Sequence, residues 1–219
     1  MKLRKLLAAL LAIYRPGFVS DSDAVANARL DSIETTIGTA PLLRIYNGTV
    51  PANAGTALSG NTLLAVGTLP SDWMAAASGR SKAKTGTWTL TGQSGAGAGT
   101  AGTFYRIYDN GATTCHQQGT FGAQVQIATN ALTAANGNVL NFASTTGVAA
   151  GMNVSGTGIV AGSTVVAFNA TTVTLSHTST AGVANATTIT FAPDMTVDNN
   201  NIANGQSLTV NTFTRTAGN

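Results

Sequence analysis

Few residues of this chain are of a type that does chemistry, and they are scattered along it. Its 219 residues include two His, one Cys and eight Asp or Glu. Cys115 and His116 are adjacent soft ligands, but zinc requires three or four, and His177 is the sole other imidazole. A catalytic Cys–His pair needs an orienting third group, and neighbouring strand residues point to opposite faces. We therefore expect Cys115 in the core, His116 facing solvent, and no catalytic residue.

A second polar cluster consists of Asp194, Asp198 and the three asparagines at 199–201. Oxygen atoms at such close spacing are the ligands that calcium prefers. Asp and Asn side chains also stabilise tight turns by hydrogen bonding to their own backbone. The spacing favours the turn, and we expect neither a bound metal nor a cofactor.

The low charge of the chain is its most informative property. Asp, Glu, Lys and Arg make up 9% of the residues, against about 25% in an ordinary soluble domain. None of the four occurs between residues 110 and 193. A surface of hydroxyls and amides is desolvated at little cost when a partner docks, whereas catalytic sites usually need clustered titratable groups. The composition therefore predicts a structural or binding protein and not an enzyme.

The net charge of +3 does not predict a nucleic-acid partner. Five of the eleven cations lie in the first thirty residues, and Arg80, Lys82 and Lys84 cluster in one predicted loop. A nucleic-acid-binding protein usually presents a broad basic face with interleaved aromatic residues. No such pattern follows residue 84, so we expect no nucleic acid as a partner.

The first fourteen residues carry an apolar stripe at helical spacing. The stripe consists of Leu3, Leu6, Leu7, Leu10, Leu11 and Tyr14. The basic start and apolar run also fit a secretory signal, but no small-x-small cleavage site follows, and the run is too short to cross a bilayer. We expect an amphipathic arm that docks in a protein groove. A membrane-surface helix and a helix packed on its own core are the alternatives.

A second helix is predicted over residues 22–37. Pro16 and Gly17 end the first helix, and the run of Ser and Asp at 20–23 supplies N-cap residues. Gly38 is expected to end the second helix. Residues 1–38 thus form an N-terminal helical arm.

From residue 39 onward the pattern predicts β-structure. Strands are expected over 42–46, 62–66, 86–90, 104–108, 139–142, 152–154, 164–168, 172–175, 188–191, 195–197 and 207–213. Short strands at regular spacing are typical of a sandwich or barrel. The predicted fold is mainly β, an antiparallel sandwich or barrel-like platform that follows the helical arm.

The predicted platform is formed by residues 39–130 and 193–219, with a small β module inserted at 131–192. The module differs from the platform in composition, because it contains no Asp, Glu, Lys or Arg and is rich in Thr and Gly. An insertion between two strands is tolerated where the ends of the loop are close and exposed. The module is therefore expected to project from the platform.

Trp73 and Arg80 are candidate contacts for a partner. Trp73 and Trp88 lie near the basic residues 80–84 in the sequence. A Trp at an interface supplies much of the affinity for a partner. The alternatives for these aromatic side chains are the edge of the core and a grip on a sugar or an acidic neighbour.

One family resemblance is carried by residues 41–65, which read PLLRIYNGTVPANAGTALSGNTLLA. This stretch resembles the opening of small virion proteins of tailed phages and prophages, with the pattern L-R-I-Y-x-G-T-x-P-A and then a T-L-L-A strand. Residues 102–109 and 194–213 resemble later strands of that group. Residues 131–191 are similar to β segments that recur in phage and bacterial surface proteins.

The resemblance implies a structural protein of the virion, without a cofactor. We expect a capsid decoration (cement) protein on the outer surface of the shell, with the major capsid protein and other copies of itself as partners, as a trimer or other oligomer. The leucine stripe would clasp one of these partners. A tail, baseplate or fibre protein and an exported bacterial surface adhesin are the alternatives, and a membrane is not an expected partner.

Overall fold

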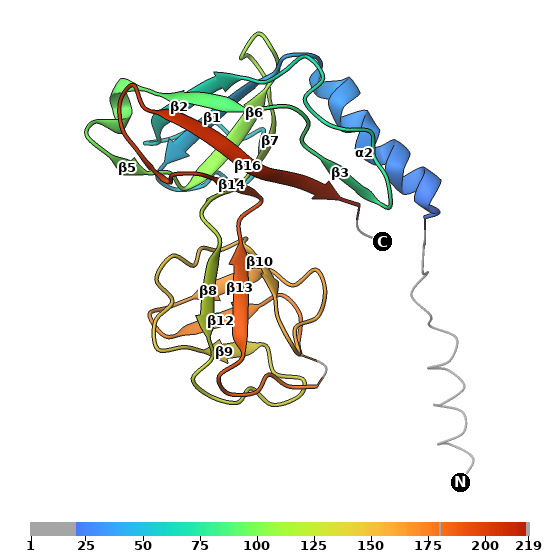
Figure 1. Cartoon of the computed structure of the whole chain (residues 1–219), viewed down its shortest axis with the longest axis vertical. Coiled ribbons are helices and arrows are strands. Elements are labelled where there is room, and N and C mark those ends of the chain that lie inside the picture. Colours follow the sequence, from blue (N-terminus) through green and yellow to red (C-terminus); the bar gives the residue numbers. More distant parts are fainter. Residues whose placement is uncertain (1–20, 180, 218–219) are drawn as a thin grey trace.

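The computed structural model describes residues 21–179 and 181–217. It is mainly β, with 41% of residues in strands and 9% in helices. Figure 1 shows a larger lobe that carries a long helix at one side, and a smaller β lobe attached to it. The predicted fold class is confirmed. The helix expected over 3–14, with the whole leucine stripe, lies outside the described residues.

Helix α2 spans Asp23–Ile37 and confirms the second predicted helix. The Ser22 side chain caps it by accepting a hydrogen bond from the Val25 N–H, at 3.4 Å. Gly38 ends it with a positive φ of 90°, which a residue with a side chain adopts only at a cost. The buried residues of the helix are Ala26, Leu30 and Ile37. Its apolar face therefore packs on the larger lobe, where Ile37 joins the core.

The larger lobe is a closed barrel of seven strands. They are β1 (Leu42–Asn47), β2 (Thr62–Thr68), β4 (Thr89–Gly92), β6 (Phe104–Tyr108), β7 (Cys115–Gly122), β14 (Met195–Val197) and β16 (Ser207–Thr216). Their order is β14-β7-β6-β1-β2-β4-β16, and a β14–β16 pairing closes the ring. Closure leaves these strands without a free edge.

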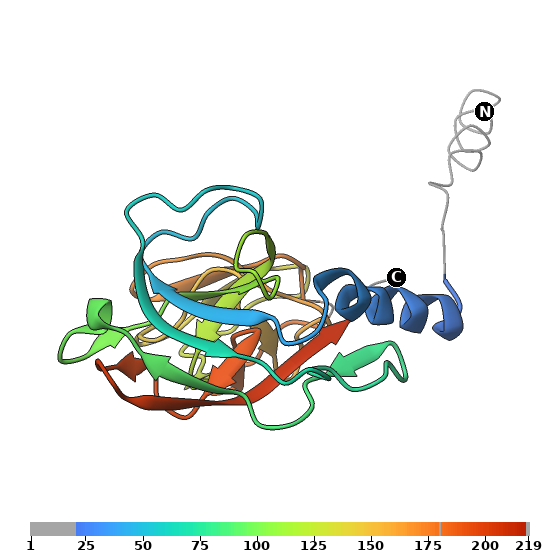
Figure 2. The same ribbon diagram turned by 90° about the horizontal axis from the view of Figure 1, so that it is seen from above.

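Shorter elements complete the barrel lobe. They are β3 (Ser81–Ala83), η1 (Ser94–Ala96), β5 (Thr100–Ala101) and β15 (Asn201–Ile202). β3 pairs with the outer end of β16 and contacts α2. Figure 2 shows β16 running across the barrel towards the side where α2 lies. The hairpin that contains β3 thus joins the helix to the barrel.

Aromatic rings fill the barrel core. The ring of Phe213 lies 5.3 Å from that of Trp88 and 5.6 Å from that of Tyr105, centroid to centroid. Trp73 lies 5.9 Å from Trp88. Such pairs contribute about 0.5–1.5 kcal/mol each beyond the area that they bury. Both tryptophans of the chain therefore belong to the barrel core.

The pairing of β7 with β14 is parallel, and it fixes where the second lobe is attached. Met195 lies opposite Phe121, and Thr196 opposite Gly122. Parallel neighbours cannot be joined by a hairpin and need a crossover of a dozen or more residues. The inserted module is that crossover, because the chain leaves the barrel after β7 and returns at β14.

The module contains six short strands in two sheets. They are β8 (Val125–Ala128), β9 (Val139–Asn141), β10 (Asn153–Ser155), β11 (Val165–Phe168), β12 (Thr172–Leu175) and β13 (Thr188–Ala192). The sheet orders are β10-β13-β8 and β11-β12-β9. The module has its own buried cluster, in which the rings of Phe142 and Phe191 meet edge to face at 5.6 Å.

Two boundaries of the sequence prediction are wrong. The module starts at β8 and not at residue 131, because Val125 to Ala128 pair with β13 and pack on the module core. The strand expected over 86–90 begins at Thr89, because Gly86 has a φ of 63° and forms a turn. Strand β7 was not predicted, and β3 was expected to be a loop.

Because each lobe has a buried core of its own, we expect the two lobes to unfold separately in urea. Phe142→Ala removes a ring from the module core and should cost about 3–5 kcal/mol of unfolding free energy there. Trp73 and Trp88 both lie in the barrel, so tryptophan fluorescence reports barrel unfolding alone. We expect the fluorescence-detected urea midpoint of the variant to match the parent, while far-ultraviolet circular dichroism shows an earlier transition. If the fluorescence-detected midpoint of the variant falls together with its circular dichroism transition, the two cores are not separate.

Candidate interaction site

The charged residues that the structure brings together lie where α2 meets the β3 hairpin. Lys82 of β3 donates to Asp31 Oδ1 at 2.8 Å and approaches Glu34 Oε2 at 3.1 Å. Its side chain is 2% exposed. A buried ammonium needs such partners, since an unpaired buried charge is costly. Asp31 and Glu34 are one turn apart on α2, so one lysine reaches both.

The same two carboxylates also hold the backbone of the hairpin. Glu34 Oε1 accepts hydrogen bonds from the Trp73 and Met74 N–H groups, at 3.1 and 3.2 Å. Asp31 Oδ1 accepts one from the Ala77 N–H at 2.9 Å. The helix is therefore fastened to the barrel by ion pairs and by backbone hydrogen bonds together.

The hydrogen bonds of this network shift two pKa values. The bond from Lys82, with that from the Ala77 N–H, lowers the pKa of Asp31 below its ordinary value. Burial alone would lower the pKa of Lys82, but its bonds to Asp31 and Glu34 outweigh burial and raise it. Both groups are thus held in their charged forms.

Arg80, a predicted partner contact, binds the start of α2. Its backbone adopts a φ of 64°, and its N–H donates to Asn27 Oδ1 at 2.9 Å. Its guanidinium donates to the Asp21 carbonyl at 3.0 Å and to Asp23 at 3.2 Å. Arg80 therefore fixes the point at which the N-terminal segment joins the folded body.

The prediction that Trp73 contacts a partner is wrong. Its side chain is 0% exposed. The indole Nε1–H donates to the Gly38 carbonyl at 3.1 Å, and the ring packs near Trp88 in the barrel core. Trp73 thus joins the end of α2 to the core, which was the alternative interpretation of this residue.

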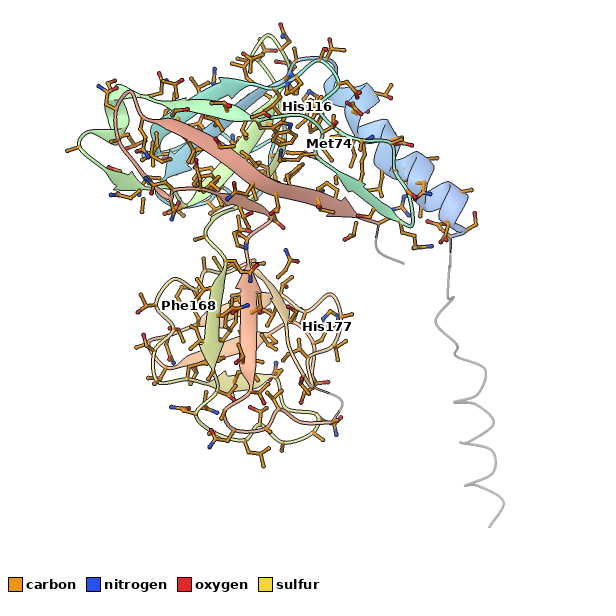
Figure 3. The ribbon with its side chains drawn as sticks, in the orientation of Figure 1. Met74, His116, Phe168 and His177 are labelled. Carbon is orange, nitrogen blue, oxygen red and sulfur yellow. The ribbon has the colours of Figure 1, made fainter. Side chains whose placement is uncertain are left out.

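An open hollow lies beside the network between α2 and the segment that follows residue 70. Its volume is about 600 Å³, and its lining includes Asp31, Glu34, Asp72 and Met74. Figure 3 shows Met74 between the barrel and the helix. Asp31 and Glu34 are engaged by Lys82 and by backbone N–H groups, so they are unsuited to proton transfer. The two carboxylates that α2 contributes to the hollow are thus already bound within the chain.

The remaining chemical candidates have structural roles. Cys115 Sγ donates to the Gln117 carbonyl at 3.3 Å, and burial raises the pKa of this half-buried thiol, which makes it a poor nucleophile. His116 lies on the barrel and His177 on the module (Figure 3), where His177 contacts the Ser176 hydroxyl at 3.1 Å. Cys115 and His116 are both half-buried, so the expectation that Cys115 lies in the core while His116 faces solvent is not confirmed.

The acidic cluster near residue 194 joins the two lobes and forms a turn. Asp194 Oδ2 accepts hydrogen bonds from the Thr120 N–H at 2.9 Å and from its hydroxyl at 3.0 Å. Its Oδ1 accepts one from Asn153 of the module at 3.3 Å. Asp198 Oδ1 accepts one from the Thr209 N–H at 3.0 Å. These oxygens of Asp194 and Asp198 thus bind distant parts of the chain. The local turn bond is made by Asn199 Oδ1, which accepts a hydrogen bond from the Asn201 N–H at 2.9 Å.

Arg106, which the sequence did not single out, organises a surface loop from inside the barrel lobe. It is 3% exposed, and its guanidinium donates to Gln118 and to the carbonyls of Asn53 and Thr56. Gln118 in turn donates to the Pro51 carbonyl at 2.6 Å. The residues 51–56 are therefore anchored to β6 and β7. The sequence gives no signal for this role, except that Lys and Arg are rare in this chain.

Within residues 21–179 and 181–217, no three His, Cys, Asp or Glu side chains gather as a metal site would require. In the same residues, no helix has the length and apolar character needed to span a membrane. No protein-family model, curated protein or solved structure matches this chain.

Lys82→Met tests the fastening of the helix. The variant keeps the length of the side chain but leaves Asp31 and Glu34 without their cation. Because both carboxylates are partly exposed, we expect a loss of about 1–3 kcal/mol in unfolding free energy. The matched control is Arg29→Met, which breaks an exposed pair with Asp21 and should cost less than about 1 kcal/mol. Urea titration measures both. Equal losses in the two variants would show that the Lys82 network stabilises the fold no more than an exposed ion pair does.

The lowered pKa of Asp31 predicts a pH dependence. The carboxylate contributes stability above the pKa of the unfolded chain, near 4, and this contribution is lost as pH falls through the lower folded value. Asp31→Asn, which starts from a lower stability at neutral pH, should lose less unfolding free energy between about pH 5 and about pH 2 than the parent. Urea titrations across this range measure the difference, and parallel profiles would contradict the assignment.

Proposed function

We propose that this protein is a structural component of a tailed-phage virion, and that it decorates the outside of the capsid. It binds the major capsid protein and other copies of itself. The observation that carries the proposal is that the charges of the chain are used internally. Seven of the eight carboxylates have a partner within the chain, namely Asp21, Asp23, Asp31, Glu34, Asp109, Asp194 and Asp198.

Most carboxylates of the chain are therefore already paired before a partner docks. Residues 110–193, which supply the module and part of the barrel, contain no Asp, Glu, Lys or Arg. Hydroxyl and amide groups lose water at a lower cost than ions when a large surface is covered. The outer surface therefore favours static assembly on a lattice over turnover of a substrate.

The leucine stripe, Leu3 to Tyr14, supplies the attachment in this proposal. The base of the segment is held firmly, because Arg80 binds the backbone and side chains at the start of α2. Burial of apolar surface contributes roughly 25 cal/mol per Å², so an arm that buries a few leucines contributes several kcal/mol per copy. Repetition over a lattice stiffens the shell against internal pressure.

The proposal is tested by substitutions in the arm. Leu7→Asp with Leu10→Asp places charge on the stripe, so the full-length variant should lose binding to capsids that lack the protein. Ala12→Asp is the matched control, because helical spacing puts residue 12 on the opposite face. Binding is measured by co-sedimentation with the capsids, and tryptophan fluorescence checks that the barrel is folded. Full occupancy by the stripe variant, or by a chain without residues 2–15, would overturn the proposal.

A second placement keeps the virion and moves the protein to the tail, baseplate or fibre. The observation that favours it is a set of exposed apolar side chains on the module, namely Leu132, Val139, Val166 and Phe168. A surface of this kind suits a contact with a host surface as well as a contact with a neighbouring capsid protein.

A further inference from the structure

One aromatic side chain departs from the pattern of the whole molecule. Eleven aromatic residues lie in the described ranges, and ten of them are buried. Phe168, at the end of β11, is 46% exposed. Figure 3 places it on the module, away from the helix and the ion-pair network. The barrel and module cores are complete without this ring.

The Phe168 side chain lines an open hollow of about 410 Å³. The rest of the lining is contributed by residues 144–148 and by Asn169 and Ala170. Val148 and Thr145 are buried, whereas Ser144, Thr146 and Asn169 are exposed. The hollow thus combines an aromatic wall and a partly apolar floor with a rim of hydroxyl and amide groups.

The polar rim is held in a defined orientation. Asn169 Oδ1 accepts hydrogen bonds from the backbone N–H groups of Thr171 and Thr172, at 2.9 and 2.8 Å. The amide nitrogen of Asn169 is then left as a donor without a partner in the described part of the chain. Ser144 and Thr146 share a hydrogen bond of 2.8 Å between their hydroxyls, and each keeps further bonding capacity.

The two segments that form the hollow are also tied to one another. The Thr145 hydroxyl donates to the Asn169 carbonyl, and the Thr145 N–H donates to the Ala170 carbonyl at 3.1 Å. The Val148 N–H donates back to the Thr145 carbonyl at 3.0 Å. A ligand would therefore meet groups that are already in place, which lowers the entropy lost on binding.

The chemistry of the hollow selects an uncharged ligand that has an apolar face and several hydroxyl groups. No Asp, Glu, Lys or Arg occurs from residue 110 to residue 193, so the module has no carboxylate, ammonium or guanidinium group to bind an ion. A pyranose ring has C–H groups that pack on an aromatic ring and hydroxyls that bond to Asn, Ser and Thr. A protein partner would instead need about 800 Å² of contact surface, much more than this hollow offers.

We propose that the Phe168 hollow binds a pyranose unit of a neutral polysaccharide. Phe168 contacts the C–H groups of the sugar, Asn169 Nδ2 donates to a ring or hydroxyl oxygen, and the Ser144 and Thr146 hydroxyls bond to further hydroxyls. This activity goes beyond virion assembly and does not depend on it. It would let an assembled particle adhere to an uncharged glycan surface.

The experiment uses the full chain and four neutral polysaccharides, namely dextran, mannan, galactan and xylan, with anionic alginate as a control. Affinity electrophoresis measures retardation of the protein by each polysaccharide. We expect retardation by at least one neutral polysaccharide and none by alginate. Phe168→Ala should weaken that binding about tenfold or more, and Phe168→Trp should preserve it because an aromatic face remains.

Val166→Ala is the matched control. Val166 lies on the same strand and is 59% exposed, but it does not line the hollow. It should bind as the parent does. The proposal is overturned if none of the four neutral polysaccharides is bound, if Phe168→Ala binds normally, or if Val166→Ala loses as much. Light scattering gives the oligomeric state of the parent and of Phe168→Ala. If the parent is a dimer or trimer and the variant is a monomer, the surface around Phe168 binds a second copy, and the proposal is also overturned. Capsid binding by the arm is measured separately, so the two proposals fail independently.

Discussion

The return of the chain to the barrel after the module is the constraint on which the rest of the structure depends. β14 must lie between β7 and β16 to close the ring, and a parallel partner can be reached only by a long crossover. Asp194 secures this point through Thr120 of the barrel and Asn153 of the module. Gly119 leaves room for it, because a Cβ at that position would lie 2.6 Å from Asp194 Oδ2 and displace this carboxylate. Burial raises the pKa of the nearby Tyr105 hydroxyl, which stays neutral beside the carboxylate.

This closure separates the tasks of the two lobes. The barrel holds both tryptophans and the Lys82 network. It is therefore the part of the molecule that fixes α2 in place. The module holds a core of its own and none of the charge. In the two proposals, attachment belongs to the barrel side of the molecule, and contact with an uncharged ligand belongs to the module.

The sequence was most informative where a cap or a dense run of apolar residues marks an element. The helix that ends at Gly38 and the strand at 104–108 were predicted closely, because caps and dense apolar residues mark them. β7 was missed because Gln, Thr and Gly dominate it and most of its residues are half-buried. The partnership of Lys82 with α2 arises only from tertiary contact across about fifty residues. For the same reason the sequence could not decide between core and interface for Trp73.

The most direct test of the account is a cryo-electron microscopy map of the intact virion, with the position and the copy number of this chain determined together. The account predicts the barrel seated on the outside of the shell, at a fixed ratio to the major capsid protein, with residues 3–14 in a groove of a neighbouring chain and the module facing outward. A chain confined to the tail, or leucines buried against their own barrel, would contradict it.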